Sequence, residues 1–144
     1  YTSGIKITSI DGKISSEYDV KTAVSNNGID WKKTGQSAIE LGEKDSNIAR
    51  ACVMACDDQY KAWYPVVSKK TRQYRIGYGE SSDGFHFKRK DDRPEAGLFA
   101  SGENGDWDSV AVTYPYVFEH EDTLYMLYNG NGFGKTGFGL AIWE

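Results

Sequence analysis

The residues best suited to chemistry in this chain are carboxylates that lie beside aromatic side chains. Asp108 follows Trp107, and Asp106 precedes it, in a polar segment ahead of a predicted strand that begins at Tyr114. A carboxylate beside an aromatic ring can hold a sugar, because the ring face stacks while the acid binds hydroxyl groups or transfers protons. We therefore take Asp108 as a candidate catalytic residue, and Trp107 and Tyr114 as candidate stacking surfaces. The structural alternative is that Asp108 and Ser109 only cap a turn.

A second carboxylate, Glu80, and an arginine, Arg50, extend this set of candidates. Glu80 lies in a predicted third strand, where the matching positions of the other repeats hold Val24 and Ile142, which indicates a specific partner or an exposed strand end. We take Glu80 as the second candidate catalytic residue. Arg50 comes just before the predicted strand that starts near Cys52. Its planar guanidinium can orient a carboxylate or bind a sugar hydroxyl, and it can equally form a structural ion pair.

The stretch from residue 129 to residue 137 is the most glycine-rich part of the chain. It lacks the spacing of a phosphate-binding loop, and no helix is predicted after it, so nucleotide binding is not expected. Glycine lets the backbone turn sharply here. We expect Asn129, Asn131 and Lys135 to be offered to a ligand from this loop.

The cysteines, histidines and acidic pairs do not predict a metal site or a cofactor. Cys52 and Cys56 lie on one predicted strand, on the same face and about 13 Å apart, so a regular strand cannot join them in a disulfide. With only His86 and His120 elsewhere, no cluster has the spacing of zinc ligands. We expect inert, buried thiols. The pairs at 57–58 and 91–92 are predicted to be solvated turns, because two adjacent acids are too few for calcium.

Two phrases that repeat along the chain predict the elements that carry these residues. Residues 25–33 (SNNGIDWKK) return as residues 81–89 (SSDGFHFKR), and residues 53–64 return in outline as residues 117–128. Each phrase has two apolar runs around an Asn, Asp or Gly centre, which is typical of a β-hairpin. Repeated pairs of hairpins are the sequence signature of β-propeller blades. No helical spacing persists over a dozen residues.

The predicted fold is therefore all-β, with propeller blades built from four-stranded antiparallel sheets. We expect a single partial propeller domain over residues 1–144, with about two and a half blades. The end of one blade falls in residues 1–35, a complete blade in 48–91 and a final blade in 105–144.

Strand direction predicts which side of this fold carries function. Alternate connections of antiparallel strands lie on the same rim. The short turns at 26–28, 57–59, 82–84 and 121–123 should share one rim, which we name the short-turn rim. The long connections at 35–49, 65–73, 91–113 and 129–136 should share the opposite, long-connection rim. Long loops on a rigid scaffold commonly carry binding and catalysis, so we expect the site on the long-connection rim.

Composition restricts the partners. The chain has 144 residues, 39% of them hydrophobic and 26% charged, and a net charge of −4. It offers no basic stripe for nucleic acid, and neutral polyols fit better than polyanions. No apolar run approaches the roughly 20 residues that span a bilayer, so no membrane partner is expected. Tyr1 is not an initiator Met, and residues 1–4 resemble the end of a strand, which suggests a fragment or a processed product.

Taken together, these motifs resemble bacterial glycosidase-like five-bladed β-propellers, the relatives of arabinanases, xylosidases, levansucrases and invertases. The resemblance covers the carboxy-terminal half of such a propeller. Its residues are Ile48-Ala49-Arg50, 74–84 (YRIGYGESSDG), Trp107-Asp108-Ser109, Tyr114-Pro115 and 125–132 (YMLYNGNG). The resemblance implies a central funnel in which carboxylates from successive blades hydrolyse or transfer glycosyl groups.

The same resemblance implies what this chain lacks. The base or nucleophile of such enzymes normally comes from the first blade, which is absent here. Similar sequences tend to have Pro where Ala51 stands and an acidic residue where Val110 stands. Three hypotheses follow: a glycosidase-like module that uses carboxylate acid/base hydrolysis, a non-catalytic or degenerate sugar-binding module, and a scaffold piece that needs a partner chain. We expect a carbohydrate ligand, and either a homodimer or a missing amino-terminal half to complete the propeller.

Overall fold

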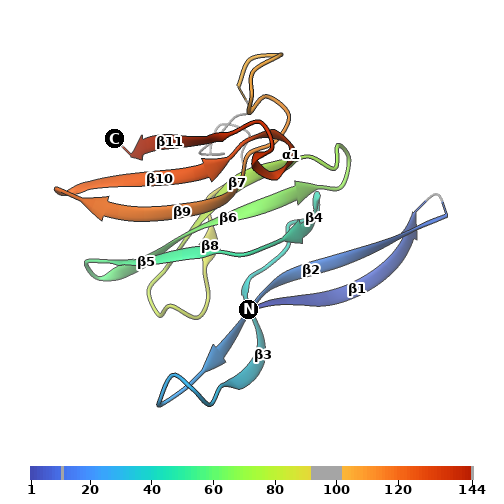
Figure 1. The fold of residues 1–144 in the computed structure, drawn as a ribbon. Coiled ribbons are helices and arrows are strands. Elements are labelled where there is room, and N and C mark those ends of the chain that lie inside the picture. Colours follow the sequence, from blue (N-terminus) through green and yellow to red (C-terminus); the bar gives the residue numbers. More distant parts are fainter. Residues whose placement is uncertain (11, 92–101, 144) are drawn as a thin grey trace.

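The computed structural model describes residues 1–10, 12–91 and 102–143, and these residues are almost entirely β (Figure 1). Within them the chain forms eleven strands and one short helical turn. In chain order these are β1 (Thr2–Ile10), β2 (Lys13–Val24), β3 (Lys32–Ile39), β4 (Asp45–Ile48), β5 (Cys52–Cys56), β6 (Gln59–Ser68), β7 (Tyr74–Ser81), β8 (Lys88–Arg89), β9 (Thr113–His120), β10 (Thr123–Asn129), α1 (Asn131–Gly134) and β11 (Phe138–Trp143).

The strands form two hydrogen-bonded sheets. The larger sheet has the order β1-β2-β4-β6-β7-β8, with β3 also paired to β2 and β5 also paired to β6. Strands β5 to β8 pair antiparallel in chain order, and we name them the four-stranded unit. The smaller sheet has the order β11-β10-β9, and we name it the three-stranded unit. This all-β arrangement is consistent with a partial β-propeller, as the sequence predicts.

The repeated phrase at 25–33 and 81–89 forms the same turn twice. In the β2–β3 turn, the side-chain oxygens of Ser25 and Asn27 each accept backbone N–H groups two and three residues further on. In the β7–β8 turn, Ser81 and Asp83 accept in the same pattern. The glycine of each turn has φ of 72° and 73°, a conformation that glycine adopts without steric cost. The prediction of two matching hairpin turns is confirmed.

Strand β6 (Gln59–Ser68) is the centre of the packing. Residues 62–67 are all buried, because both faces of this strand are covered. Successive side chains of a strand point to opposite faces, and accordingly Tyr64 belongs to one apolar cluster while Trp63 belongs to the other. The Tyr64 cluster also contains Ala38, Ile39, Ile48, Ala62, Val66 and Phe87. The Trp63 cluster joins the two units through Ile76, Tyr78, Val112, Val117, Met126 and Tyr128.

Two parts of the amino-terminal region differ from the sequence prediction. Residues 1–4 were expected to end a strand, but β1 starts at Thr2 and pairs with β2 over its whole length. The connection at 35–49 was expected to be a long loop, but it contains the end of β3 and the buried strand β4. An Asp11-Gly12 pair between apolar runs is a strong hairpin signal that would have predicted the β1–β2 hairpin. In Figure 1 this hairpin extends away from the other strands.

A buried ionic cluster ties the outer strands of the four-stranded unit together. The Asp91 side chain is fully buried, and Arg89 donates to both of its oxygens at 3.0 Å. Arg75 donates to Asp91 at 2.6 Å, and Asp45 accepts ion pairs from Arg89 at 2.7 Å and from Arg75 at 3.6 Å. The Tyr64 hydroxyl donates to Asp91 at 2.9 Å. The prediction that residues 91–92 form a solvated turn is therefore wrong for Asp91, because two arginines neutralise it inside the fold; Asp92 lies outside the described residues.

Candidate functional site

The candidate site lies at the long-connection rim, where the segment before β9 meets the connection between β10 and β11. Asn131 joins the two segments. Its side-chain oxygen accepts the N–H groups of Val110 and Ala111 at 2.8 and 2.9 Å, and its side-chain nitrogen donates to the carbonyl of Asp106 at 3.1 Å. Its backbone N–H donates to the carbonyl of Trp107 at 2.9 Å. The sequence analysis expected Asn131 to face a ligand. In the structure its side chain binds the backbone of the segment before β9 instead.

Trp107 is packed on one side and exposed on the other. Its ring stacks on Tyr128 with centroids 5.6 Å apart, and 36% of the residue remains exposed. Glycine allows this approach, since a Cβ at Gly130 would lie 2.4 Å from the indole and a Cβ at Gly139 would lie 2.8 Å from it. Thr136 donates to the Trp107 carbonyl at 2.6 Å. The glycines of this segment therefore make room for an aromatic ring.

Asp108 is oriented by a tyrosine. The Tyr128 hydroxyl donates to the Asp108 carboxylate at 3.0 Å. Burial, and then this hydrogen bond, raise the pKa of Tyr128 to about 12, so the hydroxyl stays protonated and can only donate to Asp108. Asp108 is half-buried and has no ion pair among the described residues. Such a carboxylate can accept hydrogen bonds from a ligand.

A second aromatic group lies on the same rim. Tyr114, at the start of β9, is 37% exposed and tilts against Phe133 of α1 with centroids 6.0 Å apart. Phe133 is 57% exposed and also meets Tyr74 of β7 edge-on at 5.4 Å. Both Tyr114 and Phe133 have left-handed backbones, with φ of 51° and 60°. Such conformations are uncommon away from glycine and often mark functional positions.

Phe133 and Tyr74 were not predicted as site residues. A lone phenylalanine within a glycine-rich loop is a signal that would have identified Phe133, because little in such a loop can bury it. Lys135 of the same connection is exposed. The Asn129 side chain donates to the Phe133 carbonyl at 3.5 Å. It also lies beside Gly134, where an added Cβ would be 3.2 Å from it. The rim thus gathers Trp107, Asp108, Tyr114, Asn129 and Lys135 from the predicted set.

Arg50 lies apart from this group. It is exposed and lines a pocket of about 540 Å³ between β2 and the β7–β8 turn. The pocket also includes Lys21, Val24, Phe85 and Phe87, and none of the other predicted site residues.

Glu80 also lies apart, at the other end of its strand. It is the next-to-last residue of β7, beside the short turn that leads to β8, whereas Asp108 precedes β9 on the long-connection rim. Tyr78 donates to Glu80 at 2.8 Å, and Lys90 forms an ion pair with it at 3.3 Å. The hydrogen bond from Tyr78, with help from Lys90, lowers the pKa of Glu80. The structure therefore places the two candidate catalytic carboxylates near opposite rims.

The thiols and histidines take no part in the rim. Cys52 and Cys56 are free and lie on the same strand, as predicted, but both are half-buried rather than buried. The Cys52 sulfur accepts the N–H of Val117 at 3.2 Å, which links the inner strands β5 and β9. His86 and His120 are exposed. Within residues 1–10, 12–91 and 102–143, no three His, Cys, Asp or Glu side chains gather closely enough to hold a metal ion.

Comparison with known sequences finds two curated relatives, while no protein-family model matches. They are "Uncharacterized protein MT1551" and "Uncharacterized protein Rv1502", both from Mycobacterium tuberculosis. Their identities to this chain are 35% and 34% over 128 residues, or 87% of this chain. The chain spans 40% of the length of each of these relatives.

Comparison with solved structures shows the fold. The chain is similar to a solved structure described as "Glycoside hydrolase", with a TM-score of 0.69, over 99% of this chain and 39% of that one. It is also similar to "Bombyx mori GH32 beta-fructofuranosidase BmSUC1", with a TM-score of 0.65, over 100% of this chain and 30% of that one. Sequence identity is 20% in both cases. The chain therefore has a glycosidase-like fold.

In the part of the chain that is described, no helix has the length and apolar character needed to cross a bilayer.

Proposed function

We propose that this chain is the carbohydrate-binding part of a glycosidase-like β-propeller, with the sugar held on the long-connection rim. The observation that carries this proposal is the group of exposed aromatic side chains on that rim. Trp107 and Phe133 come from two connections that Asn131 holds together, and Tyr114 lies at the start of β9. Aromatic faces bind apolar surfaces in water and leave hydroxyl groups free for polar partners. The glycosidase-like fold adds support from an independent direction.

The polar residues of the rim complete this proposal. Asp108, oriented by Tyr128, would accept hydrogen bonds from sugar hydroxyls. Lys135 and Asn129, which flank Phe133 in the chain, would donate to sugar oxygens. The ligand class that fits this set is an oligosaccharide, because stacking surfaces and hydrogen-bonding groups lie on the same rim.

We do not propose hydrolysis by Asp108 and Glu80 together. A glycosidase needs two carboxyl groups on either side of one bond, about 5–10 Å apart, and one of them needs a raised pKa to act as the acid. Glu80 has a lowered pKa and lies toward the other rim. We therefore propose that Glu80 does not act together with Asp108 on one glycosidic bond, and that this chain binds sugar without cleaving it.

Binding is tested by titrating the protein with neutral oligosaccharides and following intrinsic fluorescence or calorimetry. We expect Phe133→Ala to weaken binding several-fold, because one stacking surface is lost, at roughly 0.5–1.5 kcal/mol for an aromatic contact. Phe85→Ala is the matched control, since Phe85 is an exposed phenylalanine in the β7–β8 turn on the other rim. Equal binding by the wild type and Phe133→Ala would contradict the proposed rim.

Hydrolysis is tested in the same preparation with a panel of aryl glycosides. We expect no turnover above the background. Turnover that disappears in Asp108→Asn would overturn the non-catalytic proposal and show that a complete carboxylate set forms in solution.

We also propose that further blades cover the open face of the three-stranded unit, supplied by a second copy of this chain. Paired positions on neighbouring strands share one face, and the pairs Tyr116 with Leu127, Leu127 with Leu140, and Tyr125 with Ile142 place apolar groups together. Tyr116, Leu140 and Ile142 are 54%, 57% and 58% exposed. Light scattering after size-exclusion chromatography should give a dimer. A monomer would favour blades from a longer chain, and aggregation without sugar binding would favour the scaffold hypothesis.

A further inference from the structure

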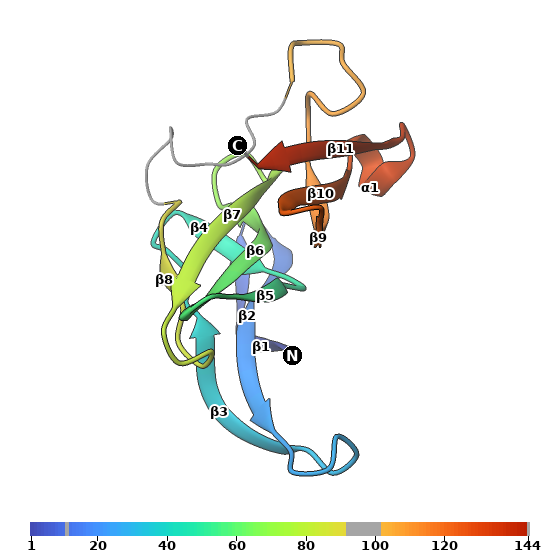
Figure 2. The same cartoon turned by 90° about the vertical axis from the view of Figure 1, so that its left-hand side faces the viewer.

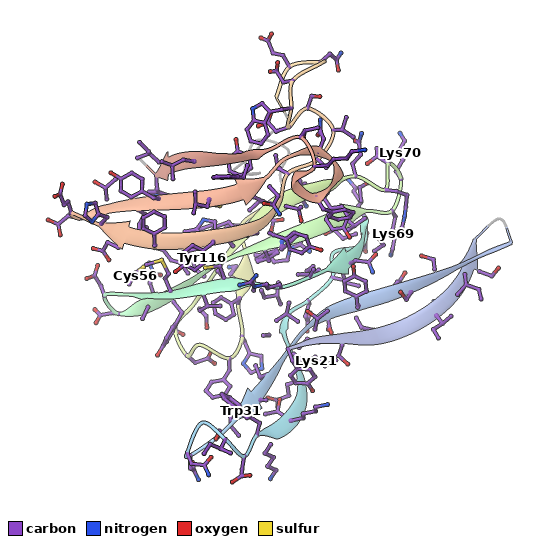
Figure 3. The ribbon with its side chains drawn as sticks, in the orientation of Figure 1. Lys21, Trp31, Cys56, Lys69, Lys70 and Tyr116 are labelled. Atoms are coloured by element: carbon purple, nitrogen blue, oxygen red, sulfur yellow. The ribbon has the colours of Figure 1, made fainter. Side chains whose placement is uncertain are left out.

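A basic pocket lies beside the exposed aromatic side chains of the long-connection rim. None of the site residues predicted from the sequence lines it. The connection between β6 and β7 carries Lys69, Lys70 and Arg72, and all three line a pocket of about 600 Å³. The opposite wall comes from the start of β2, far away in the sequence. Figure 3 shows Lys69 and Lys70 on the same side of the molecule as α1, above the β1–β2 hairpin. The remaining lining residues are Ile14, Ser15, Ser16, Tyr18, Asn47, Val67 and Tyr74.

The charge of this pocket is opposite to that of the chain. The chain has a net charge of −4, whereas no acidic side chain lines the pocket. The nearest balancing group is Glu17, which lies 3.6 Å from the Lys69 ammonium. Lys69 also donates to the Glu43 carbonyl at 3.1 Å. Lys70 and Arg72 have no ion pair among the described residues, so two positive charges remain uncompensated.

The basic turn is held in shape by its own hydrogen bonds. The Ser68 hydroxyl accepts the N–H groups of Lys70 and Thr71 at 3.2 and 3.3 Å, and the Ser68 carbonyl accepts the N–H of Arg72 at 3.0 Å. Arg72 has a left-handed backbone with φ of 59°, which costs energy for a residue with a side chain. Its guanidinium donates to Ser46 at 2.9 Å. The turn therefore fixes the direction of the Arg72 side chain. The guanidinium has further N–H groups that can bind a ligand.

Tyr74 connects this pocket to the aromatic side chains of the long-connection rim. Tyr74 lines the pocket and also meets Phe133 edge-on at 5.4 Å. Burial, and then a hydrogen bond with Tyr18, raise the pKa of Tyr74 to about 12, so its hydroxyl is protonated at neutral pH. A ligand that stacks on Phe133 can therefore extend a charged group toward Lys70 and Arg72.

We propose that this pocket binds the anionic group of an acidic oligosaccharide, a carboxylate or a sulfate ester. The guanidinium of Arg72 would pair with two oxygens of the anion and Lys70 would add a point charge. The neighbouring sugar units would lie on Phe133 and Tyr114. This inference rests on the carbohydrate-binding function proposed above and narrows the ligand from neutral to acidic saccharides. The competing structural explanation is a solvated basic turn, which predicts no preference for charged sugars.

The test compares three probes on the purified protein by calorimetry: trigalacturonate, a sulfated galactose trisaccharide and the neutral galactose trisaccharide. We expect at least one acidic probe to bind about ten-fold or more tightly than the neutral probe at roughly 50 mM salt, with the difference shrinking at roughly 300 mM salt. The two acidic probes distinguish a carboxylate from a sulfate ester as the recognised group.

Variants assign the preference to this pocket. Lys70→Gln removes an exposed charge without an ion-pair partner in the described part of the fold, and Arg72→Gly removes the guanidinium and relieves the left-handed backbone. Each should reduce binding of the acidic probe by about three- to ten-fold and leave the neutral probe unchanged. Lys32→Gln, an exposed lysine at the start of β3, is the matched control and should have no effect. Lys70→Gln keeps the test valid even where Arg72→Gly perturbs the turn.

Each outcome separates this inference from the proposed function. Equal binding of acidic and neutral probes, or acidic binding that survives in both pocket variants, would overturn the anionic pocket and leave carbohydrate binding intact. Binding of none of the three probes would overturn both. A preference for an acidic probe that disappears in Lys70→Gln but persists in Lys32→Gln would support both.

Discussion

Two tyrosines at matching places in the repeat, Tyr64 and Tyr128, each donate to an aspartate, with opposite consequences. Tyr64 and Asp91 lie inside the four-stranded unit, and two arginines neutralise the carboxylate. Tyr128 and Asp108 lie at the rim of the three-stranded unit, and Asp108 has no ion pair in the described part of the chain. The Tyr–Asp pair therefore stabilises the buried interior of the four-stranded unit. In the three-stranded unit, the matching pair leaves a carboxylate that can accept hydrogen bonds at the rim.

The difference lies in what surrounds each carboxylate. Asp91 comes after β8 (Lys88–Arg89), and its buried side chain accepts hydrogen bonds from Arg89 and from Arg75 of β7 (Tyr74–Ser81). Asp108 comes from the connection that precedes β9, where no arginine among the described residues pairs with it. Figure 2 shows β8 beside β7 at one edge, with residues 102–112 extending beyond the three-stranded unit. A buried carboxylate requires paired charges, whereas a half-exposed one remains available to ligands.

Removal of the buried carboxylate should have the largest effect on stability. Asp91→Asn leaves Arg75 and Arg89 with Asp45 as their only remaining acid in the cluster, among the described residues. We expect the free energy of unfolding to fall by about 3–5 kcal/mol, as when one partner of a buried ion pair is lost, measured by urea denaturation. Asp58→Asn, in the exposed β5–β6 turn, is the control and should change it by less than about 0.5 kcal/mol. A loss for Asp91→Asn as small as this control would contradict the structural role.

Acid should weaken the same cluster. Burial alone raises the pKa of Asp91, but the hydrogen bonds and charges of Arg89 and Arg75 outweigh it and lower the pKa below the usual 3.8. The stabilisation is therefore complete above about pH 4, the unfolded-state pKa, and is lost as pH falls through the lower folded pKa. We expect the wild type to lose this stabilisation as the pH falls below about 4, measured by urea midpoints.

The comparison for this pH prediction is the Asp91→Asn protein. The pKa of Asp83 is also lowered, by backbone N–H groups of His86 and Phe85, so some acid sensitivity persists in every variant. Asp91→Asn should lose less stability than the wild type over the same pH interval. Parallel curves for the two proteins would show that Asp91 does not contribute.

The close packing around Asp91 should make Gly77 hard to replace. A Cβ at Gly77 would lie 2.5 Å from the Asp91 carboxylate and 2.6 Å from the Tyr64 ring. We expect Gly77→Ala to lower the free energy of unfolding by about 1–3 kcal/mol, the usual cost of overpacking. Gly4→Ala in β1 is the matched control, because nothing lies within 4 Å of its Cβ and its φ is not left-handed. Equal stability of these two variants would contradict the packing argument.

The two tyrosine hydroxyls give the most direct comparison of the core with the rim. Tyr64→Phe leaves a buried Asp91 oxygen with one donor fewer, and we expect a loss of about 1–3 kcal/mol. Tyr128→Phe affects a part-buried bond, and we expect about 0.5–1.5 kcal/mol. Calorimetry should also show weaker saccharide binding for Tyr128→Phe alone, because Asp108 loses its orientation. A larger stability loss in Tyr128→Phe than in Tyr64→Phe would reverse the assignment of core and rim.

Much of the fold and part of the site could be predicted from the sequence. Short apolar runs around Asn, Asp and Gly centres predicted most strands, and the proximity of Trp107 and Asp108 in the chain placed both on one rim. Glu80 could not be placed in this way, because its position in a repeat does not reveal its ion pair with Lys90. The role of Arg72 depends on neighbours that are distant in the sequence, such as Ser46, so the pattern did not identify it.

Trp31 and Phe87 show a difference in burial that the local sequence does not predict and that the tertiary structure determines. They occupy matching places after two turns of the same local structure, yet Trp31 is 61% exposed and Phe87 is 8% exposed. The sequence by itself determined the turns and the alternation of faces, because left-handed glycine and a period of two are local properties. The tertiary structure decided which faces are covered and which aspartate meets arginine, because both depend on strands that pack together only in the folded chain.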